Sequence, residues 1–215
     1  MTATGPGTAS PPRRRGPGSR ADAGHPTRLE LLDAAVRLAE ADGLAALSVA
    51  RVCAAAGHAK GTFYVHFPDR AGFLVALHRQ FHDVVFGRVV EATAGDAPGP
   101  ARAGRRLLAF FDGCRALPGV RALLLEARAD PAVAGEVERR NRQATAVLSA
   151  DLAGCCAHPR ETARLLVLAA ADVAARESGR GRRLAPARQA VLALVPGGTE
   201  PARPSARSSI RMTMR

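Results

Sequence analysis

The chain has 215 residues with 31 Lys and Arg against 19 Asp and Glu, which gives a formal net charge of +12. Helix-forming residues dominate, Trp is absent, and no clear run alternates apolar with polar residues as an exposed strand would. No stretch of about 18 uncharged apolar residues is present, so no membrane-spanning helix is expected. No apolar segment follows Arg13 to Arg15, so a secretory signal is not expected either. The composition predicts an all-α protein.

The basic charge is concentrated at the two ends of the chain. Residues 1–28 carry five Arg and one Asp, and residues 200–215 carry four Arg and one Glu. The body between them holds 22 basic and 17 acidic residues, a net charge of only +5. This distribution is compatible with a nucleic-acid partner but does not establish one.

Residues 1–26 are rich in Gly, Pro, Ser, Thr and Arg, and we expect them to be disordered. They form either a basic arm for the DNA minor groove or a solvated tail, which is the favoured interpretation. The first helix is expected over about 27–42 because Leu29, Leu32 and Val36 share one face. Gly43 ends this helix.

The segment 47–67, LSVARVCAAAGHAKGTFYVHF, predicts a helix-turn-helix. Apolar residues from Val49 to Ala56 recur at helical spacing, Ser48 can cap the first helix, and Gly57 suits the turn. In the second helix, which we call the recognition helix (60–66), Phe63 points inward. Its outward side is small and hydroxylated, which suits close approach to a DNA major groove. A purely structural helical hairpin is the alternative.

The run AAAGHAKGTFYVHFPDRAGFL, preceded by LSVARVC and TRLELLDAAVRLAEADG, resembles the DNA-binding domain of the TetR family of bacterial transcriptional regulators. The resemblance extends from Thr27 to about Phe81 and implies a three-helix domain that binds an operator. Four residues depart from the usual pattern. They are His58 where Val is usual, Ala59 for a capping Ser, Arg70 for Lys, and Gly72 for Glu.

Eight residues are predicted to contact DNA. Thr62, Val65 and Lys60 are expected to contact bases, and Gly61 to permit close approach. Tyr64, His66, Arg70 and Arg51 are expected to hold phosphates.

Asp69 is expected to cap a long helix over 70–94 that leaves the DNA-binding domain. His78 and His82 lie four residues apart on it and are a possible metal pair. No third ligand is evident, so an ordinary polar pair is favoured and no metal or cofactor is predicted.

GDAPGP at 95–100 is the clearest internal break, and helices are expected after it at about 101–115, 119–128 and 132–156. The resemblance implies that this region binds an effector. Surface salt bridges or caps are the favoured alternative for its polar residues, and the sequence does not reveal the ligand. The candidate ligand-binding residues are Phe110, Phe111, Arg115, Leu124, Glu126, Arg128 and Asn141.

Helices are expected at about 160–178 and 186–195, with more apolar surface than one side of a small bundle requires. In the TetR family the last two long helices form a dimer interface, while ordinary packing within one chain is the alternative. The predicted interface residues are Leu165, Leu168, Ala169, Asp172, Val173, Val191 and Leu192. Residues 196–215 are expected to be a disordered tail.

The four cysteines, Cys53, Cys114, Cys155 and Cys156, show no CxxC pair and no zinc-finger spacing. A reduced cytosolic chain is the simplest interpretation. Cys53 is expected to pack as a small apolar residue. A redox-sensing role for the adjacent pair Cys155 and Cys156 is a minor alternative.

These features together predict a cytoplasmic, ligand-responsive repressor that binds a pseudo-palindromic DNA operator as a homodimer. Its domains are residues 27–69 for DNA binding, 70–94 as the connecting helix, and 95–195 for effector binding and dimerisation. No nucleophile elbow, zinc-protease or phosphate-loop motif indicates an enzyme. The alternative is a helical protein-interaction module without sequence-specific DNA binding.

Overall fold

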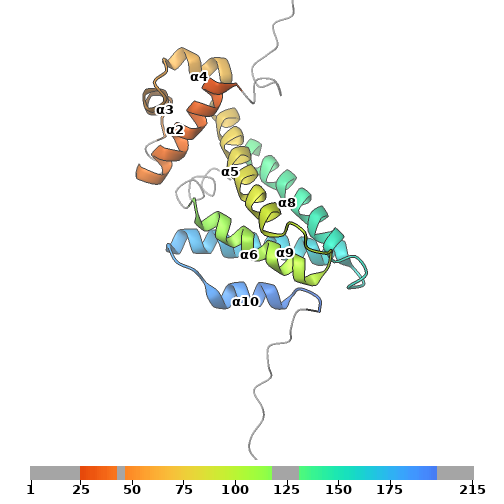
Figure 1. Cartoon of the computed structure of the whole chain (residues 1–215). Helices are drawn as coiled ribbons and strands as arrows, with labels where there is room; N and C mark the ends of the chain where they lie inside the picture. Colours follow the sequence, from red (N-terminus) through yellow and green to blue (C-terminus); the bar gives the residue numbers. More distant parts are fainter. Residues whose placement is uncertain (1–24, 43–46, 118–130, 198–215) are drawn as a thin grey trace, which may run out of the picture.

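The computed structural model describes residues 25–42, 47–117 and 131–197, and within these ranges every regular element is a helix. The first three helices are α2 (Pro26–Asp42), α3 (Val49–Ala56) and α4 (Lys60–His66). They gather at one end of the molecule, as Figure 1 shows. The predicted all-α fold is confirmed.

Helix α5 (Arg70–Ala92) runs from this end into a second group of helices (Figure 1). That group contains α6 (Pro100–Arg115), α8 (Pro131–Asp151), α9 (Pro159–Arg180) and α10 (Ala185–Ala193). Among the described helices, α9 packs against α6, α8 and α10, and α5 packs against α6 and α8. One helix therefore belongs to both groups.

Helix boundaries follow local signals. Asp69 accepts a hydrogen bond from the backbone N–H of Gly72 at 2.7 Å, which caps the start of α5 as predicted. Helix α8 ends at Asp151, five residues earlier than expected, because a turn intervenes in which Gly154 has φ +75°. The helix expected at 119–128 lies outside the described residues, as do 1–24 and 198–215.

The core of the N-terminal group is aromatic. Phe63, Phe67 and Phe73 are buried, and each pair of their ring centroids is 5.1 Å apart. Aromatic rings at this separation add specific attraction to the free energy of burial. This cluster joins α4 to the start of α5 and so fixes the recognition helix on its support.

An ion cluster around a buried arginine joins three helices of the second group. Arg188 of α10, which is 1% exposed, donates to both carboxylate oxygens of Glu177 at 2.8 and 2.7 Å. It also donates to Asp112 of α6 at 2.6 Å, and its guanidinium lies 4.8 Å from the ring centroid of Phe111. Burial alone would raise the pKa of Glu177, but the hydrogen bonds from Arg188 and the Leu184 backbone lower it. Glu177 is therefore ionised at neutral pH.

Helices α5 and α6 approach each other closely at one point. Gly113 is buried, and a Cβ atom placed on it would lie 3.2 Å from Cγ1 of Val85. Since that distance is shorter than ordinary van der Waals contact, the Val85 side chain would have to shift by a few tenths of an ångström to admit a larger residue. Gly113 thus allows α6 to contact the middle of α5.

Candidate nucleic-acid interface and internal pocket

The turn between α3 and α4 has the predicted geometry. Ser48 accepts a hydrogen bond from the backbone N–H of Arg51 at 3.2 Å, and this caps α3. Gly57 adopts φ +73°, a left-handed conformation that favours glycine, and ends α3. Val52 and Cys53 are buried beneath the turn. These residues form a helix-turn-helix, as the sequence predicted.

Helix α4 presents a narrow outward face. Val65 is 64% exposed and Tyr64 is 55% exposed, while the neighbouring Phe63 is fully buried. Lys60 and Gly61 are exposed and Thr62 is half-buried. An exposed Val65 offers an apolar contact for a thymine methyl group, and Lys60, Thr62 and Tyr64 offer hydrogen bonds. The outward face can therefore approach a base-pair surface without moving the core.

The residues assigned to phosphates differ in their environment. Arg70 is exposed at the first turn of α5, and no ion pair to a described residue holds it. Arg51 is exposed but donates to Asp42 of α2 at 2.6 Å. A phosphate contact by Arg51 would have to compete with this ion pair, whereas Arg70 is available.

His66 does not lie where the sequence prediction placed it. Its side chain is only 5% exposed, and its ring centroid lies 4.8 Å from that of His25. Because His66 is three residues after Phe63, both side chains point to the same buried face of α4. The assignment of His66 to a phosphate is therefore corrected to packing beside the N-terminal residues of α2.

The start of α4 lacks a side-chain cap. Ala59 occupies the N-cap position with extended backbone angles and makes no side-chain hydrogen bond there. The preceding His58 is held instead by Glu30 of α2, with Nε2 and Oε2 2.7 Å apart. The turn is thus tied to α2, but an N–H group of the recognition helix is left without a capping oxygen.

Replacing Ala59 with Ser is expected to stabilise the protein by about 1 kcal/mol, because the hydroxyl can accept from a free N–H of α4. For a chain of this size that corresponds to a rise of about 2–4 °C in melting temperature, measured by circular dichroism. Ala55→Ser is the matched control, since Ala55 is exposed inside α3 and offers no cap. An equal change for the two variants would contradict the assignment of the cap position.

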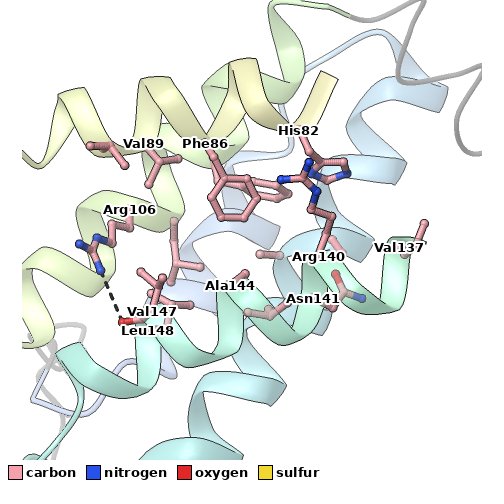
Figure 2. Close-up of a pocket in the computed structure, with 16 residues that line it drawn as sticks. His82, Phe86, Val89, Arg106, Val137, Arg140, Asn141, Ala144, Val147 and Leu148 are labelled. Carbon is pink, nitrogen blue, oxygen red and sulfur yellow. Dashed lines mark hydrogen bonds between the residues drawn. The ribbon is translucent and has the colours of Figure 1, made fainter. Parts of the chain in front are cut away.

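A pocket lies between α5, α6, α8 and α9, and its volume is about 110 Å³. Figure 2 shows its lining side chains, which are mostly apolar. Among the predicted ligand-binding residues, Phe110 and Asn141 line it. Phe111 is buried beneath Arg188, and Arg115 is exposed. Leu124, Glu126 and Arg128 lie outside the described residues.

Sequence analysis missed most of the pocket lining. His82, Phe86, Val89 and Val90 of α5 line it together with Arg106 and Arg140. The spacing 82, 86, 89, 90 places these four on one helical face, but the sequence analysis assigned this helix only a connecting role. Arg106 donates to Asp151 at 2.7 Å, and this partner could not be deduced from a separation of 45 residues.

The end of the pocket near Arg140 adjoins a second ion cluster. Arg140 forms ion pairs with Asp83 at 2.7 Å and with Glu136 at 3.3 Å. Arg79 and Arg139 also contact Glu136. Burial alone would raise the pKa of Glu136, but hydrogen bonds and charges from Arg139 and Arg79 outweigh burial and lower the pKa to about 2. Glu136 is therefore ionised at neutral pH.

Helix α9 carries an apolar stripe that no described residue covers. The stripe consists of Leu165, which is 65% exposed, and Leu168, which is 46% exposed, and the charged Asp172 lies one turn further along the same helical face. Leu194, which follows α10, is also exposed and was not predicted. Ala169 and Leu192 are half-buried. Val173 and Val191 are instead buried within the chain, because they face inward between α9, α10 and the rest of the core.

The cysteines are free in the described structure, and Cys53 and Cys114 are buried. Burial raises the pKa of the Cys53 thiol, although the Phe63 backbone and Lys60 act in the opposite direction. The expectation that Cys53 packs as a small apolar residue is confirmed.

His78 and His82 stack with their ring centroids 4.3 Å apart. Within the described ranges, no group of three or more potential ligands could hold a metal ion.

The described helices include none that is both long enough and apolar enough to cross a membrane. An all-helical fold with an exposed second helix in a helix-turn-helix defines a class of DNA-binding proteins. Comparisons with known proteins agree with that class. Residues 31–77 match the family model described as bacterial regulatory proteins of the TetR family. No curated protein sequence matches.

Solved structures share the fold over most of the chain. The multidrug binding protein EbrR, solved with imidazole, is 24% identical, with 80% of this chain and 96% of that chain covered and a TM-score of 0.65. FadR, a fatty acid degradation regulator from Bacillus halodurans, is 18% identical, with 81% and 96% covered and a TM-score of 0.65. A TetR-family regulator from Streptomyces coelicolor is 22% identical, with 78% of each chain covered and a TM-score of 0.60.

The N-terminal domain therefore belongs to the TetR family, and the chain has the fold of that family's transcriptional regulators. Family and fold together support a DNA-binding regulator.

Proposed function

We propose that this protein is a homodimeric, cytoplasmic repressor that binds a pseudo-palindromic operator and is released by a small-molecule effector. The observation that carries DNA binding is the outward face of α4. There Lys60, Gly61, Tyr64 and Val65 are exposed while Phe63 anchors the helix. In a dimer, two copies of α4 would enter successive major grooves about 34–36 Å apart.

The proposed domain scheme assigns residues 27–69 to DNA binding, 70–94 to the connecting helix and 95–195 to effector binding and dimerisation. The uncovered stripe of α9 supports dimerisation, because an exposed apolar stripe of this kind marks an interaction surface. The pocket beside α5 supports an effector. One structural relative is described as a multidrug binding protein, which agrees with a small-molecule ligand.

Selection of fragments from the source genome on the purified full-length protein tests this function. The expected result is enrichment of a dyad-symmetric site, and the genes beside it would be those regulated. A folded, dimeric protein that enriches no such site would overturn the proposal. That outcome would favour the alternative of a helical protein-interaction module.

Arg70 and Thr62 are expected to respond differently to substitution. Arg70→Ala should weaken binding to all sequences about equally and lower the slope of log K against log salt by about one unit per subunit. Thr62→Ala should change the preferred base at one position in each half-site, with a loss of about 1–3 kcal/mol for the natural site. Fluorescence anisotropy over a salt series, on cognate and scrambled duplexes, measures both effects.

Arg88→Ala is the matched control for the charge. Arg88 is exposed on the same helix, about 27 Å along α5 from Arg70. Its replacement removes an equal charge away from the recognition helix and is expected to leave the slope nearly unchanged. An unaltered slope for Arg70→Ala, or an equal change for both variants, would contradict the phosphate contact.

A further inference from the structure

The pocket has a size that limits its ligand. Its volume is about 110 Å³, and a buried water needs roughly 10–15 Å³ by this measure, so the pocket has room for about seven to eleven non-hydrogen atoms. Val90 and Val147 line it and are both exposed, which opens the pocket to solvent on that side. The inference that follows concerns the ligand of this pocket and rests on the proposed ligand-responsive function.

The charged side chains that line the pocket are both cationic. Among its described lining residues there are two arginines, Arg106 and Arg140, and no carboxylate. Asp151 is shared, since Arg102 and Arg106 both donate to it at 2.7 Å. The carboxylate of Asp151 is fully buried, and both arginines pair with it. This cluster therefore keeps an excess of one positive charge.

The second cluster has the same sign. Arg79, Arg139 and Arg140 face two carboxylates, Glu136 and Asp83. Three guanidinium groups against two carboxylates again leave one positive charge. Asp83, Arg79 and Arg139 are exposed, so solvent weakens the contribution of each, whereas Arg140 and Glu136 are mostly buried. The pocket thus lies between two clusters that each carry net positive charge.

Hydrogen-bonding groups converge at the Arg140 end of the pocket. Figure 2 shows the guanidinium of Arg140 beside the ring of His82, with Asn141 on the same helix next to it. The contacts that Arg140 makes with described residues use Nε and Nη2 and leave Nη1 available. Asn141 also lines the pocket, and its side-chain amide can both donate and accept a hydrogen bond. These donors can serve a ligand without breaking an existing ion pair.

We propose that the pocket binds a small apolar monoanion, a carboxylate with a hydrocarbon or aryl body. Its carboxylate lies at Nη1 of Arg140 and the amide of Asn141, and its body lies along Phe86, Val89 and Phe110. A cation would meet two net positive clusters and no lining carboxylate among the described residues. A neutral molecule of equal length would gain the apolar contact but not the charge-assisted hydrogen bond.

Three eight-carbon probes test the charge preference on the full-length protein. Octanoate, octan-1-ol and octylamine each have eight carbons and carry an anionic carboxylate, a neutral hydroxyl and a cationic ammonium head group, respectively. Isothermal titration calorimetry at pH 7.5 and constant ionic strength is expected to show octanoate binding about tenfold more tightly than octan-1-ol, with octylamine weakest. Equal or tighter binding of octylamine or octan-1-ol, or no binding of octanoate, would overturn the proposal.

Two variants locate the carboxylate. Arg140→Gln and Asn141→Leu should each weaken octanoate binding, the first by about tenfold, and leave octan-1-ol binding within about twofold. Glu136 keeps Arg79 and Arg139 as partners in Arg140→Gln, so the fold should persist, and a melting curve checks this. Asn141→Leu changes no ion pair and gives an independent result.

Arg142→Gln is the matched control for Arg140→Gln. Arg142 lies on the same helix in an exposed pair with Glu138 and does not line the pocket. Arg142→Gln removes the same charge as Arg140→Gln, so a general attraction of the basic protein for anions would weaken equally in both variants. An equal loss for the two, or no loss in Arg140→Gln and Asn141→Leu, would place the anion elsewhere and overturn the assignment.

The outcome for the pocket is separable from that for the proposed function. If octanoate did not bind more tightly than octan-1-ol and octylamine while the protein still selected a dyad-symmetric operator, only the anionic ligand class would be overturned. Specific octanoate binding by a protein that selects no operator would overturn the repressor function and leave the ligand class standing.

Discussion

Leu165→Glu is expected to convert the proposed dimer into a monomer at micromolar concentration. Leu165 is 65% exposed on α9 beside Leu168, and this stripe is the proposed interface. In a two-fold symmetric interface each substitution occurs twice, once from each subunit. If each buried Glu costs about 2 kcal/mol or more, the dissociation constant should rise about a thousandfold. Sedimentation equilibrium over a range of concentrations measures the change.

Val84→Glu provides the control for Leu165→Glu. Val84 is also an exposed apolar residue on a long helix, but it lies on α5 and outside the proposed interface. This variant should remain dimeric. The Leu165→Glu monomer should also bind a full operator far more weakly, with the affinity of a single half-site. A dimer that persists unchanged in Leu165→Glu would show that the stripe on α9 serves another partner.

Arg188→Met is expected to lower the free energy of unfolding by about 3–5 kcal/mol. The substitution leaves the carboxyl group of Glu177 buried without its bidentate partner, and it removes the link from α10 to Asp112 of α6. The Leu184 N–H still donates to Glu177, but one neutral donor does not replace a guanidinium. Urea unfolding at a single fixed protein concentration measures the loss, since dimerisation also contributes to stability.

Two further variants test the cause of that loss. Arg142→Met breaks an exposed ion pair on α8 and should cost less than about 1 kcal/mol. The double variant Arg188→Met/Glu177→Leu should recover much of the stability, because it also removes the buried carboxyl group that has lost its partner. A double variant as unstable as Arg188→Met would show that packing around Phe111, rather than the uncompensated carboxylate, dominates.

Features set by neighbouring residues were predictable from the sequence. The caps at Ser48 and Asp69 and the turn at Gly57 depend on side chains within about three residues, and all three have the predicted geometry. The inward direction of Phe63 follows from helical periodicity in the same way. The same periodicity would have placed His66 on the buried face, had it been applied to that residue.

Features that depend on distant partners were not predictable. The bond of Arg51 to Asp42 joins two helices whose relative orientation the sequence does not specify. The pocket likewise combines α5, α6, α8 and α9, so its lining emerges only when these helices pack. Burial of Val173 and Val191 was unpredictable for the same reason. Helices α9 and α10 each carry apolar residues on more than one face, so the sequence does not show which face is buried. Only the packed structure separates the core face from the exposed one.

The close contact between Gly113 and Val85 has a mechanical consequence for α5. Val85 lies about 22 Å along the helix from Arg70 but only about 6 Å from Val89 in the pocket. If α5 tilts as a rigid rod about this contact, it acts as a lever whose arm towards DNA is nearly four times the arm beside the pocket. A displacement of about 0.5 Å at Val89 becomes about 2 Å at Arg70, which exceeds the distance range over which a hydrogen bond persists.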